Sequence, residues 1–431
     1  MSASRRAWSA GIDVSTAEIA GQRREPQPPQ SLPVLLVFSH VRWGFLYQRP
    51  QHLMSRLAGR WRVLFVEEPM RRAGAAGLEV QELGPSLSVL VPHTPVASAG
   101  FHDEQMPLLR PLLAAYLETR RLRVDVAWLY TPMAMPLVPT VASRCVVYDC
   151  MHELPASEDA PHLWRQHEAA LLESAALVLA GGPSLFEALR TRHPHAVCLP
   201  SAVDASHFSP SGLRHDSRQA VRARELLYPL KRPRLGYFGV IDRRLDMTLL
   251  AVLADSHPEW NLVMVGPVVG VDPATLPGRP NLHWLGIQPY DRLPHLLAGW
   301  DVCLLPFAQS EITRLISPNK TLEYMAGEKP VVSTPVRDVV TLYGDAVEVA
   351  DGADAFVQAC EKVLQEDGAA RFRRNCEMLN LVSMHSWDRS ADSVHALVEA
   401  ALGQTDDAAR MAAMRMPVEP PRMSAGGGAV A

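Results

Sequence analysis

One lysine of this 431-residue chain stands where a helix does not favour it. The stretch from Ser317 to Gly327 is typical of a short helix, with Ser317 as the N-cap, Pro318 at the first position and Gly327 as the left-handed residue past the end. Lys320 falls in the first turn, where the helix dipole favours negative charge. A cation here makes sense if an anion docks on the same helix end, because free N–H groups, the dipole and a lysine together make a phosphate site.

A carboxylate on the same face extends this site. Glu323 lies three residues after Lys320 and therefore on the same side of the expected helix. It is placed to accept hydrogen bonds from hydroxyl groups of whatever carries the phosphate, and a nucleoside diphosphate with its ribose would satisfy both residues. The alternative is that both are solvated residues of a surface helix, and this stretch alone leaves the two interpretations open.

These side chains must be positioned by the strands and helices that alternate along most of the chain. Apolar runs such as 34–38, 145–149 and 261–266 are typical of parallel strands buried on both faces. Segments with helical periodicity separate them, and the alternation predicts a doubly wound α/β architecture. Ligands of such sheets bind at the carboxyl ends of the strands, so the loops that follow the strands are expected to line a cleft.

The alternation lapses once, between residues 209 and 231, where Ser, Pro, Arg and His dominate. This predicts two α/β domains, over 32–208 and 232–384, joined by a linker over 209–231. An amphipathic helix over 385–404 follows the second domain and could pack back on the first. Compositions typical of disordered tails are found at both ends of the chain, over 1–31 and 405–431.

Composition limits the classes of function. The chain has 42 Lys and Arg residues against 46 Asp and Glu residues, for a net charge of −4, which argues against a nucleic-acid-binding protein. Its 6 cysteines are scattered without a Cys-x-x-Cys pair, as expected of reduced thiols in a cytoplasmic protein. No transmembrane helix and no signal peptide are expected. Peripheral contact with the inner membrane face stays open, because the arginines of 120–123 could touch anionic lipid, although a solvated face is the commoner explanation.

Several common site motifs are missing from the sequence. No Gly-x-Gly-x-x-Gly follows a strand and no Walker loop is present, which argues against a dehydrogenase and an ATPase. A Gly-x-Ser-x-Gly elbow and a His-Glu-x-x-His motif are also missing, and the 16 histidines show no metal-ligand spacing. We therefore expect neither a metal nor a cofactor.

Other blocks of the sequence resemble a known enzyme family. Residues 200–210, with Pro-Ser-Ala-Val-Asp and then Phe-x-Pro, are similar to the domain crossover of group 1 (family 4) glycosyltransferases of the GT-B fold. Residues 320–334 are similar to the nucleotide-binding helix and strand of the same enzymes. With Arg-Pro-Gln-His-Leu at 49–53 and Tyr-Asp-Cys-Met-His-Glu at 148–153, the chain looks most like the teichuronic-acid-biosynthesis subgroup. The resemblance covers roughly residues 33–400.

The resemblance implies two Rossmann-like domains that face a central cleft, the first holding an acceptor and the second a nucleotide sugar. It implies an enzyme that moves a sugar from a nucleoside-diphosphate sugar to a polysaccharide or lipid-linked acceptor, with retention of the anomeric configuration. Without a metal, cations and a helix N-terminus must stabilise the leaving diphosphate. We expect Lys320 and Arg244 to do this, with Arg243 as the second choice. A surface salt bridge to Asp242 or Asp246 would explain Arg244 equally well.

The resemblance also implies roles for other polar residues. Glu323 would bind the ribose, and the base should lie near Ile287 and Gln288. His152 and Glu153 are candidates for assisting the acceptor hydroxyl, although a capping or buried-pair role for Glu153 is open. The other donor-site candidates are Ser317, Asn319, Gly239 and Glu311. The acceptor-site candidates, each of which could instead be structural, are His40, Arg42, Trp43, Arg49 and His52.

One departure from the family leaves the sugar end of the site unexplained. The broader family has a glutamate eight residues before the ribose-binding one, where this chain has Leu315, and the nearest acid upstream is Glu311. The loop over 308–317 must therefore be built differently. Two alternatives to a transferase stay open, namely a nucleotide-sugar 2-epimerase on the same fold and a non-catalytic protein that binds nucleotides or sugars.

Overall fold

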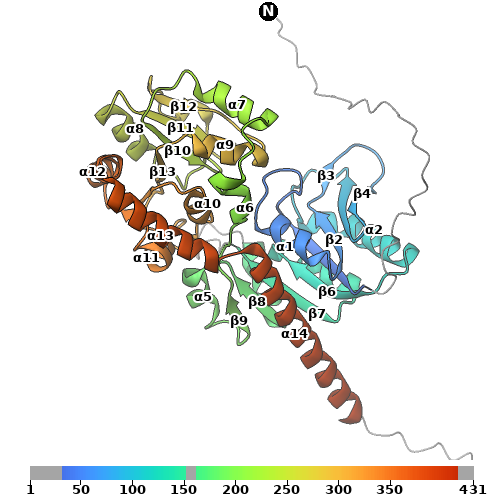
Figure 1. The fold of residues 1–431 in the computed structure, drawn as a ribbon. Helices are drawn as coiled ribbons and strands as arrows, with labels where there is room; N and C mark the ends of the chain where they lie inside the picture. Colours follow the sequence, from blue (N-terminus) through green and yellow to red (C-terminus); the bar gives the residue numbers. More distant parts are fainter. Residues whose placement is uncertain (1–31, 152–161, 416–431) are drawn as a thin grey trace, which may run out of the picture.

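The computed structural model describes residues 32–151 and 162–415 of the chain. The predicted tail over 1–31, the end of the chain from residue 416, and both His152 and Glu153 lie outside these ranges. Within the described ranges the strands form two separate sheets, each with helices packed on it (Figure 1). The predicted α/β architecture with two doubly wound domains is confirmed.

The first domain is built on nine strands in the order β3-β5-β2-β1-β6-β7-β8-β9, with β4 antiparallel to β5 at one edge. The sequence analysis did not predict β3 to β5. β4 is largely exposed and carries no apolar run, whereas β5 is buried and carries a short apolar run that the analysis overlooked. The strands are β1 (Val34–Ser39), β2 (Arg62–Glu67), β3 (Met70–Arg71), β4 (Gly77–Gly84), β5 (Leu87–Thr94), β6 (Val124–Leu129), β7 (Cys145–Cys150), β8 (Leu177–Ala180) and β9 (Ala196–Cys198).

The second domain has six parallel strands in the order β12-β11-β10-β13-β14-β15. Five of them lie where apolar runs predicted strands, because parallel strands covered on both faces need continuous apolar sequence. The strands are β10 (Arg234–Phe238), β11 (Asn261–Val265), β12 (Leu282–Trp284), β13 (Val302–Leu305), β14 (Val331–Ser333) and β15 (Glu348–Val349).

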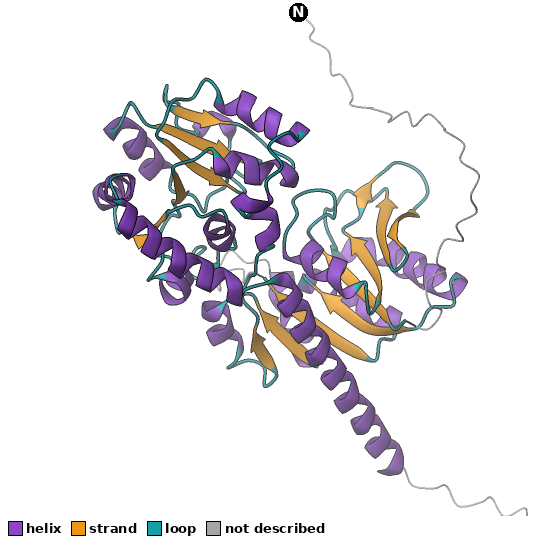
Figure 2. Ribbon diagram, viewed as in Figure 1, coloured by secondary structure: helices purple, strands orange, loops and turns teal. Residues whose placement is uncertain are grey.

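Helices cover the sheets (Figure 2). The first part of the chain has α1 (Arg49–Leu57), α2 (Met106–Thr119), α3 (Val138–Val141), α4 (His162–Ser174) and α5 (Pro183–Leu189). The second has α6 (Ala205–Phe208), α7 (Arg218–Leu227), α8 (Met247–Ser256), α9 (Leu293–Ala298), α10 (Lys320–Ala326), α11 (Arg337–Tyr343), α12 (Ala353–Leu364), α13 (Gly368–Met384) and α14 (Trp387–Arg415).

The core of the first domain has two halves, one on each face of its sheet. Leu36 and Phe38 of β1 belong to one cluster, whereas Leu35 and Val37 belong to the other, because successive side chains of a strand point to opposite faces. The second cluster also contains Trp387 and other buried residues of α14. The last helix therefore packs on the first domain, and it runs to Arg415, beyond residue 404 where the sequence placed its end.

The segment 209–231, expected to be a linker, contains a packed helix. Ala223 and Leu227 of α7 are buried in the core of the second domain. Ser217 caps this helix, because its hydroxyl accepts a hydrogen bond from the N–H of Ala220 at 3.1 Å. The sequence analysis did not predict this helix, because its three exposed arginines are as numerous as the three apolar residues that it buries.

Candidate functional site

A cavity of about 780 Å³ lies between the two domains. The first domain contributes the loop 43–49 before α1, together with Met151 after β7 and Gly181 after β8. The second domain contributes Gly239 after β10, Phe307 after β13 and the start of α10. These loops leave the carboxyl ends of parallel strands, where the sequence predicted the cleft.

The structure brings most of the predicted site residues to this cavity. Those that line it are Trp43, Arg49, Gly239, Arg244, Ile287, Gln288, Ser317, Asn319, Lys320 and Glu323. Those that the structure describes but that do not line it are His40, Arg42, His52, Arg243 and Glu311. The candidates His152 and Glu153 lie outside the described residues.

The helix that carries Lys320 begins later than predicted. α10 starts at Lys320 itself, and Asn319 takes the N-cap position without a side-chain hydrogen bond to the helix. Ser317, predicted to be the N-cap, instead packs against Gly182 of the first domain, where an added Cβ would lie 2.8 Å from the Ser317 hydroxyl. Ser317 therefore makes a contact between the domains and does not cap the helix as the local pattern predicted.

Two close contacts fix α10 in the second domain, one with β10 of the sheet and one with α9. The hydroxyl of Tyr324 accepts a hydrogen bond from the N–H of Phe238 at 2.9 Å. Gly327 has a φ of −81°, so the prediction of a left-handed residue is wrong. It is small for another reason, since a Cβ there would collide with the side chain of Leu297.

Lys320 and Glu323 form an ion pair at the cavity wall, with 3.4 Å between Lys320 Nζ and Glu323 Oε2. The side chain of Glu323 is 5% exposed, and burial raises the pKa of this carboxyl while the neighbouring Lys320 opposes the shift. Its Oε2 accepts no hydrogen bond of good geometry within the described part of the chain. A buried carboxylate with spare acceptor capacity is suited to bind hydroxyl groups.

Arg244 both lines the cavity and pairs with a neighbour, so the two interpretations of this residue are compatible. Its Nη2 lies 2.7 Å from Oδ2 of Asp242. Asp246 has a different task, because its carboxylate caps α8 by accepting the N–H of Leu249 at 2.8 Å. Arg243 is exposed and does not line the cavity.

In the loop expected to hold the base, the polar side chain of Gln288 is hydrogen-bonded within the protein. Gln288 donates to the carbonyl of Leu285 at 2.8 Å and accepts from Nη1 of Arg292 at 2.6 Å. Both ends of its amide are therefore occupied. Recognition of a base at this wall would rest on backbone groups and on Ile287, whose side chain is 52% exposed.

The opposite wall is held by Arg49, which was expected to bind the acceptor. Its Nε lies 3.0 and 3.1 Å from the two carboxylate oxygens of Asp149, and its Nη1 donates to the carbonyl of Leu199 at 2.8 Å. Burial raises the pKa of Asp149, against the effect of Arg49. The guanidinium therefore ties α1 to the ends of β7 and β9.

Two further acceptor candidates hold the loop after β1. Arg42 forms an ion pair with Glu67 at 2.9 Å, and the N–H of Trp43 donates to the same carboxylate at 2.8 Å. The ring of Trp43 lines the cavity. Burial lowers the pKa of His40, the first residue of this loop.

His52 lies at the domain boundary and not at the cavity. Its ring stacks on Trp387, with centroids 4.8 Å apart and planes 8° from parallel. Burial, followed by the nearby cations of Arg56 and Lys320, lowers the pKa of His52 to about 3. The ring is therefore neutral at physiological pH.

Two aromatic residues that the sequence interpretation missed meet at the cavity. Tyr47 of the first domain and Tyr290 of the second both line it, with ring centroids 5.1 Å apart. Tyr47 lies in a loop and Tyr290 begins a single turn of 3-10 helix, and neither segment is long enough for periodicity to mark a residue as buried. The one signal was position, because each lies in a segment that follows a predicted strand.

The described lining of the cavity holds a single acidic residue, Glu323. Glu311 is exposed and pairs with Arg314 at 3.2 Å. The loop before α10 contributes Ile316 to the wall, and Leu315 does not line it. The described lining therefore has no acid at the position where the sequence departs from the family pattern.

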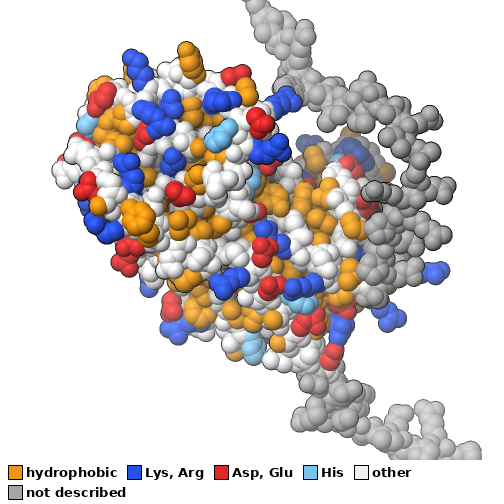
Figure 3. Space-filling model, in the orientation of Figure 1, with side chains coloured by type: hydrophobic (Ala, Val, Ile, Leu, Met, Phe, Trp, Pro, Cys, Tyr) orange, Lys and Arg blue, Asp and Glu red, His pale blue; other side chains and the backbone are white. Residues whose placement is uncertain are grey.

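The described ranges, 32–151 and 162–415, also bear on other classes of site. Within them no group of three or more His, Cys, Asp or Glu side chains could hold a metal ion. No helix of those ranges is both long and apolar enough to cross a bilayer. The face shown in Figure 3 mixes cationic and anionic side chains over both domains.

The second domain is similar to known proteins. Residues 232–366 match the family described as Glycosyl transferases group 1. A relative from Bacillus subtilis (strain 168), the "Putative teichuronic acid biosynthesis glycosyltransferase TuaH", is 30% identical over 145 residues. That alignment covers 32% of this chain and 36% of the relative, so it spans about a third of the relative's length.

Solved structures resemble the chain over most of its length. The sucrose-phosphate synthase of Thermosynechococcus elongatus has a TM-score of 0.68 and 17% identity, covering 87% of this chain and 100% of that one. Anabaena Alr3699/HepE in complex with UDP and glucose has a TM-score of 0.62 and 14% identity, covering 85% and 100%. The structure described as trehalose-6-phosphate from E. coli bound with UDP-2-fluoro glucose has a TM-score of 0.62 and 12% identity. The match covers 84% of this chain and 98% of that one.

Such low identities establish the fold and not the reaction. The shared fold is the GT-B arrangement of two Rossmann-like domains around a cleft. Residues 232–366 are thus similar to group 1 glycosyltransferases, and the chain has the GT-B fold.

Proposed function

We propose that the protein transfers a sugar from a nucleoside-diphosphate sugar to a polysaccharide or lipid-linked acceptor. The observation that carries the proposal is the wall formed by α10 within the matched segment, where Lys320 and the buried Glu323 face a cavity between two α/β domains. Two proteins of similar fold are described with UDP and glucose or with a UDP-sugar analogue, which supports the donor class. The relative named for teichuronic acid biosynthesis supports a polymeric acceptor.

The diphosphate would lie at the start of α10. Lys320 and Arg244 line the same cavity, and the first N–H groups of α10 carry partial positive charge. Charge develops on the diphosphate as the bond to the sugar breaks, and fixed cations stabilise that charge more than they stabilise the bound donor. Because these groups supply the positive charge, we propose a reaction that needs no metal ion.

The nucleoside would lie between Glu323 and the loop around Ile287. Glu323 would accept hydrogen bonds from the ribose hydroxyls through its unpaired oxygen. Ser317, Asn319 and Gly239 also line this part of the cavity and would approach the phosphates through backbone groups.

The acceptor would enter from the first domain. Trp43 and Arg49 line that wall, and His152 and Glu153, outside the described residues, follow Met151 of the same wall in the chain. Retention of the anomeric configuration is proposed from the resemblance to group 1 enzymes. We also propose a cytoplasmic enzyme that contacts the inner membrane face peripherally, since its six cysteines form no disulfide in the described ranges and a lipid-linked acceptor would lie at that face.

The test is a panel of nucleoside-diphosphate sugars, read first by thermal shift and then by product analysis. The expected result is a higher unfolding temperature with one donor class, because a ligand of the native state raises apparent stability. Sugar transfer to an acceptor glycan or lipid-linked acceptor should follow with that donor. Failure to bind any donor of a broad panel would contradict the proposal.

Product analysis also separates the two alternatives. An epimerase would convert the donor sugar when no acceptor is present, whereas a transferase would at most hydrolyse it slowly. A non-catalytic binding protein is suggested by the single acidic residue in the described lining, and it would bind a donor without releasing nucleoside diphosphate.

A further inference from the structure

The two domains are connected twice, and the two connections lie side by side. The first runs from β9 to α6, and the second joins α13 to α14. The N–H of Val203 in the first donates to the carbonyl of His385 in the second at 3.0 Å, and Val203 forms a parallel bridge with Ser386. Any change in the angle between the domains must therefore act on both connections together.

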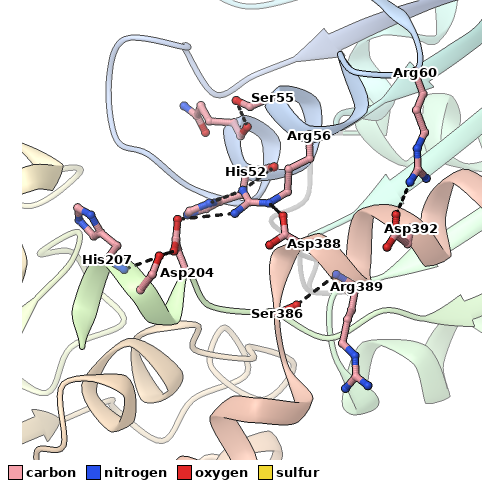
Figure 4. Close-up of polar contacts among 12 residues, drawn as sticks. His52, Ser55, Arg56, Arg60, Asp204, His207, Ser386, Asp388, Arg389 and Asp392 are labelled. Atoms are coloured by element: carbon pink, nitrogen blue, oxygen red, sulfur yellow. Dashed lines mark hydrogen bonds and ion pairs between the residues drawn. The ribbon is translucent and has the colours of Figure 1, made fainter. Parts of the chain in front are cut away.

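One arginine of the first domain contacts a residue at the end of each connection. Arg56, in the last turn of α1, has its Nε 2.6 Å from Oδ1 of Asp388, which lies in the first turn of α14. Its Nη2 lies 3.6 Å from Oδ2 of Asp204, the N-cap of α6 (Figure 4). Its Nη1 also donates to the carbonyl of His52 at 3.2 Å, which fixes the guanidinium on its own helix.

A group of packed aromatic rings extends from α1, which carries Arg56, to the second domain. His52 stacks on Trp387, which starts α14, and its Nε2 lies 3.4 Å from the hydroxyl of Tyr290. On another side His207 of α6 stacks on Tyr290, with centroids 4.1 Å apart, and its Nε2 hydrogen-bonds the carbonyl of that tyrosine at 3.2 Å. Tyr290 is thus held by α1 and by the first connection.

Tyr290 links the two connections between the domains to the cavity. It lines the cavity and follows Gln288 and Pro289 of the loop proposed for the base. Burial, followed by the negative charges of Glu323 and Asp204, raises the pKa of the Tyr290 phenol. The same ring is therefore near both the proposed ribose ligand and a partner of Arg56.

We infer that Arg56 is a positioning residue that sets the angle between the domains by holding Asp204 and Asp388 together, and that Tyr290 transmits this geometry to the nucleoside end of the cavity. We call the contacts of Arg56 with Asp204 and Asp388 the clamp. Its effect on donor binding rests on the proposed function, whereas the clamp itself can be measured without any donor.

The chain offers a matched control for the clamp. Arg60 lies one turn beyond Arg56 and pairs with Asp392, one turn further along α14, at 2.6 Å (Figure 4). This pair also joins the end of α1 to α14, but no contact of Arg60 with either connection is found among the described residues. Arg56→Gln and Arg60→Gln each remove one arginine–aspartate pair between the same helices, and only the first removes the link between the connections.

The first experiment measures amide hydrogen exchange in the full chain without ligand. We expect exchange of the Val203 amide and of peptides over 384–388 to be about fivefold faster or more in Arg56→Gln, because coupling between joined elements is typically of this size. Arg60→Gln should leave these rates unchanged. Equal acceleration in both variants, or none in either, would overturn the clamp, since the pair would then only fasten α14 to α1.

The second experiment measures steady-state transfer with the donor that the panel identifies. Arg56→Gln should lower kcat/KM about fivefold or more, chiefly through a higher donor KM. Asp388→Asn should have little further effect in that background, because its partner is already gone. Arg60→Gln should leave the donor KM unchanged. If Arg60→Gln lowers kcat/KM as much as Arg56→Gln does, the positioning role of Arg56 is overturned. If no donor binds the natural protein, the proposed function fails and the exchange rates alone decide the clamp.

Discussion

The guanidinium of Arg49 and the carboxylate of Asp149 form an ion pair that is almost closed to solvent, with 3.0 Å between Nη2 and Oδ1. Their side chains are 6% and 0% exposed. They come from the start of α1 and the end of β7, and Arg49 also reaches the carbonyl after β9. This pair therefore fixes the loop 43–49, which forms much of the first-domain wall of the cavity.

Breaking this pair should destabilise the protein strongly. Arg49→Met is expected to lower the free energy of unfolding by about 3–5 kcal/mol at neutral pH, because it leaves a buried carboxylate without its partner. Urea denaturation followed by circular dichroism would measure the loss. The double variant with Asp149→Leu is the control and should recover most of it, and a double variant as unstable as the single one would contradict this account.

The same variant should depend on pH in a stated direction. Burial raises the folded-state pKa of Asp149 above its unfolded value, so its contribution to stability is present at low pH and is lost as pH rises through the folded pKa. Removing Arg49 raises that pKa further. The deficit of Arg49→Met should therefore shrink as the pH is lowered, as measured by thermal unfolding over a pH series.

Lys320→Ala should weaken binding of the nucleoside diphosphate about tenfold or more, because a hydrogen bond to a charged group is worth roughly 1.5–3 kcal/mol. Isothermal calorimetry with the free nucleoside diphosphate would measure this. Arg243→Ala is the control, since Arg243 is exposed and lies off the cavity lining. Equal losses in both variants would indicate a general effect of charge and not a contact at α10.

Glu323→Gln should separate stability from binding. Burial raises the pKa of Glu323 above its usual value of 4.5, so its contribution to stability is present below that value and is lost as pH rises through the folded pKa. The glutamine variant should therefore be more stable than the natural protein at pH 7, by about 1 kcal/mol, and no more stable at pH 4. Its affinity for the nucleoside should fall. Lower stability at pH 7 would show that the ion pair with Lys320 outweighs the cost of burial.

Gly182 should not tolerate a side chain. A Cβ there would collide with the carboxylate of Asp338 and lie 2.6 Å from Cβ of Ser317, both in the second domain. Asp338 is fully buried and accepts the N–H of Ser184 across the boundary at 3.0 Å. Gly182→Ala is therefore expected to cost about 1–3 kcal/mol in urea unfolding.

The neighbouring glycine provides the control for this prediction. A Cβ on Gly181 would meet its nearest atom, the carbonyl oxygen of Cys150, at 3.4 Å, an ordinary contact. Gly181→Ala should therefore leave the free energy of unfolding nearly unchanged. If Gly182→Ala is equally mild, the contact between Ser317 and the first domain is looser than the structure shows.

The sequence predicted the fold class and the position of the cleft because both depend on local patterns. Strands such as β1 and β11 are buried on both faces, and continuous apolar runs are the direct consequence of that burial. Lys320 and Glu323 could be related without a structure, because residues three apart lie on one face of any helix. The cleft followed from the general rule for parallel sheets, and the cavity lies where the rule places it.

The tertiary structure decided which partner each polar side chain takes. Asp149 lies 100 residues from Arg49, and the pairing depends on how α1 packs on β7, which no local pattern encodes. Ser317 lost its predicted capping role for the same reason, because the first domain approaches it at Gly182. α7 replaced a predicted linker because the second domain buries a narrow apolar stripe that arginines conceal in the sequence. Hydrophobic burial imposes a periodic pattern on the sequence, whereas ion pairs and domain contacts depend on distances that exist only after folding.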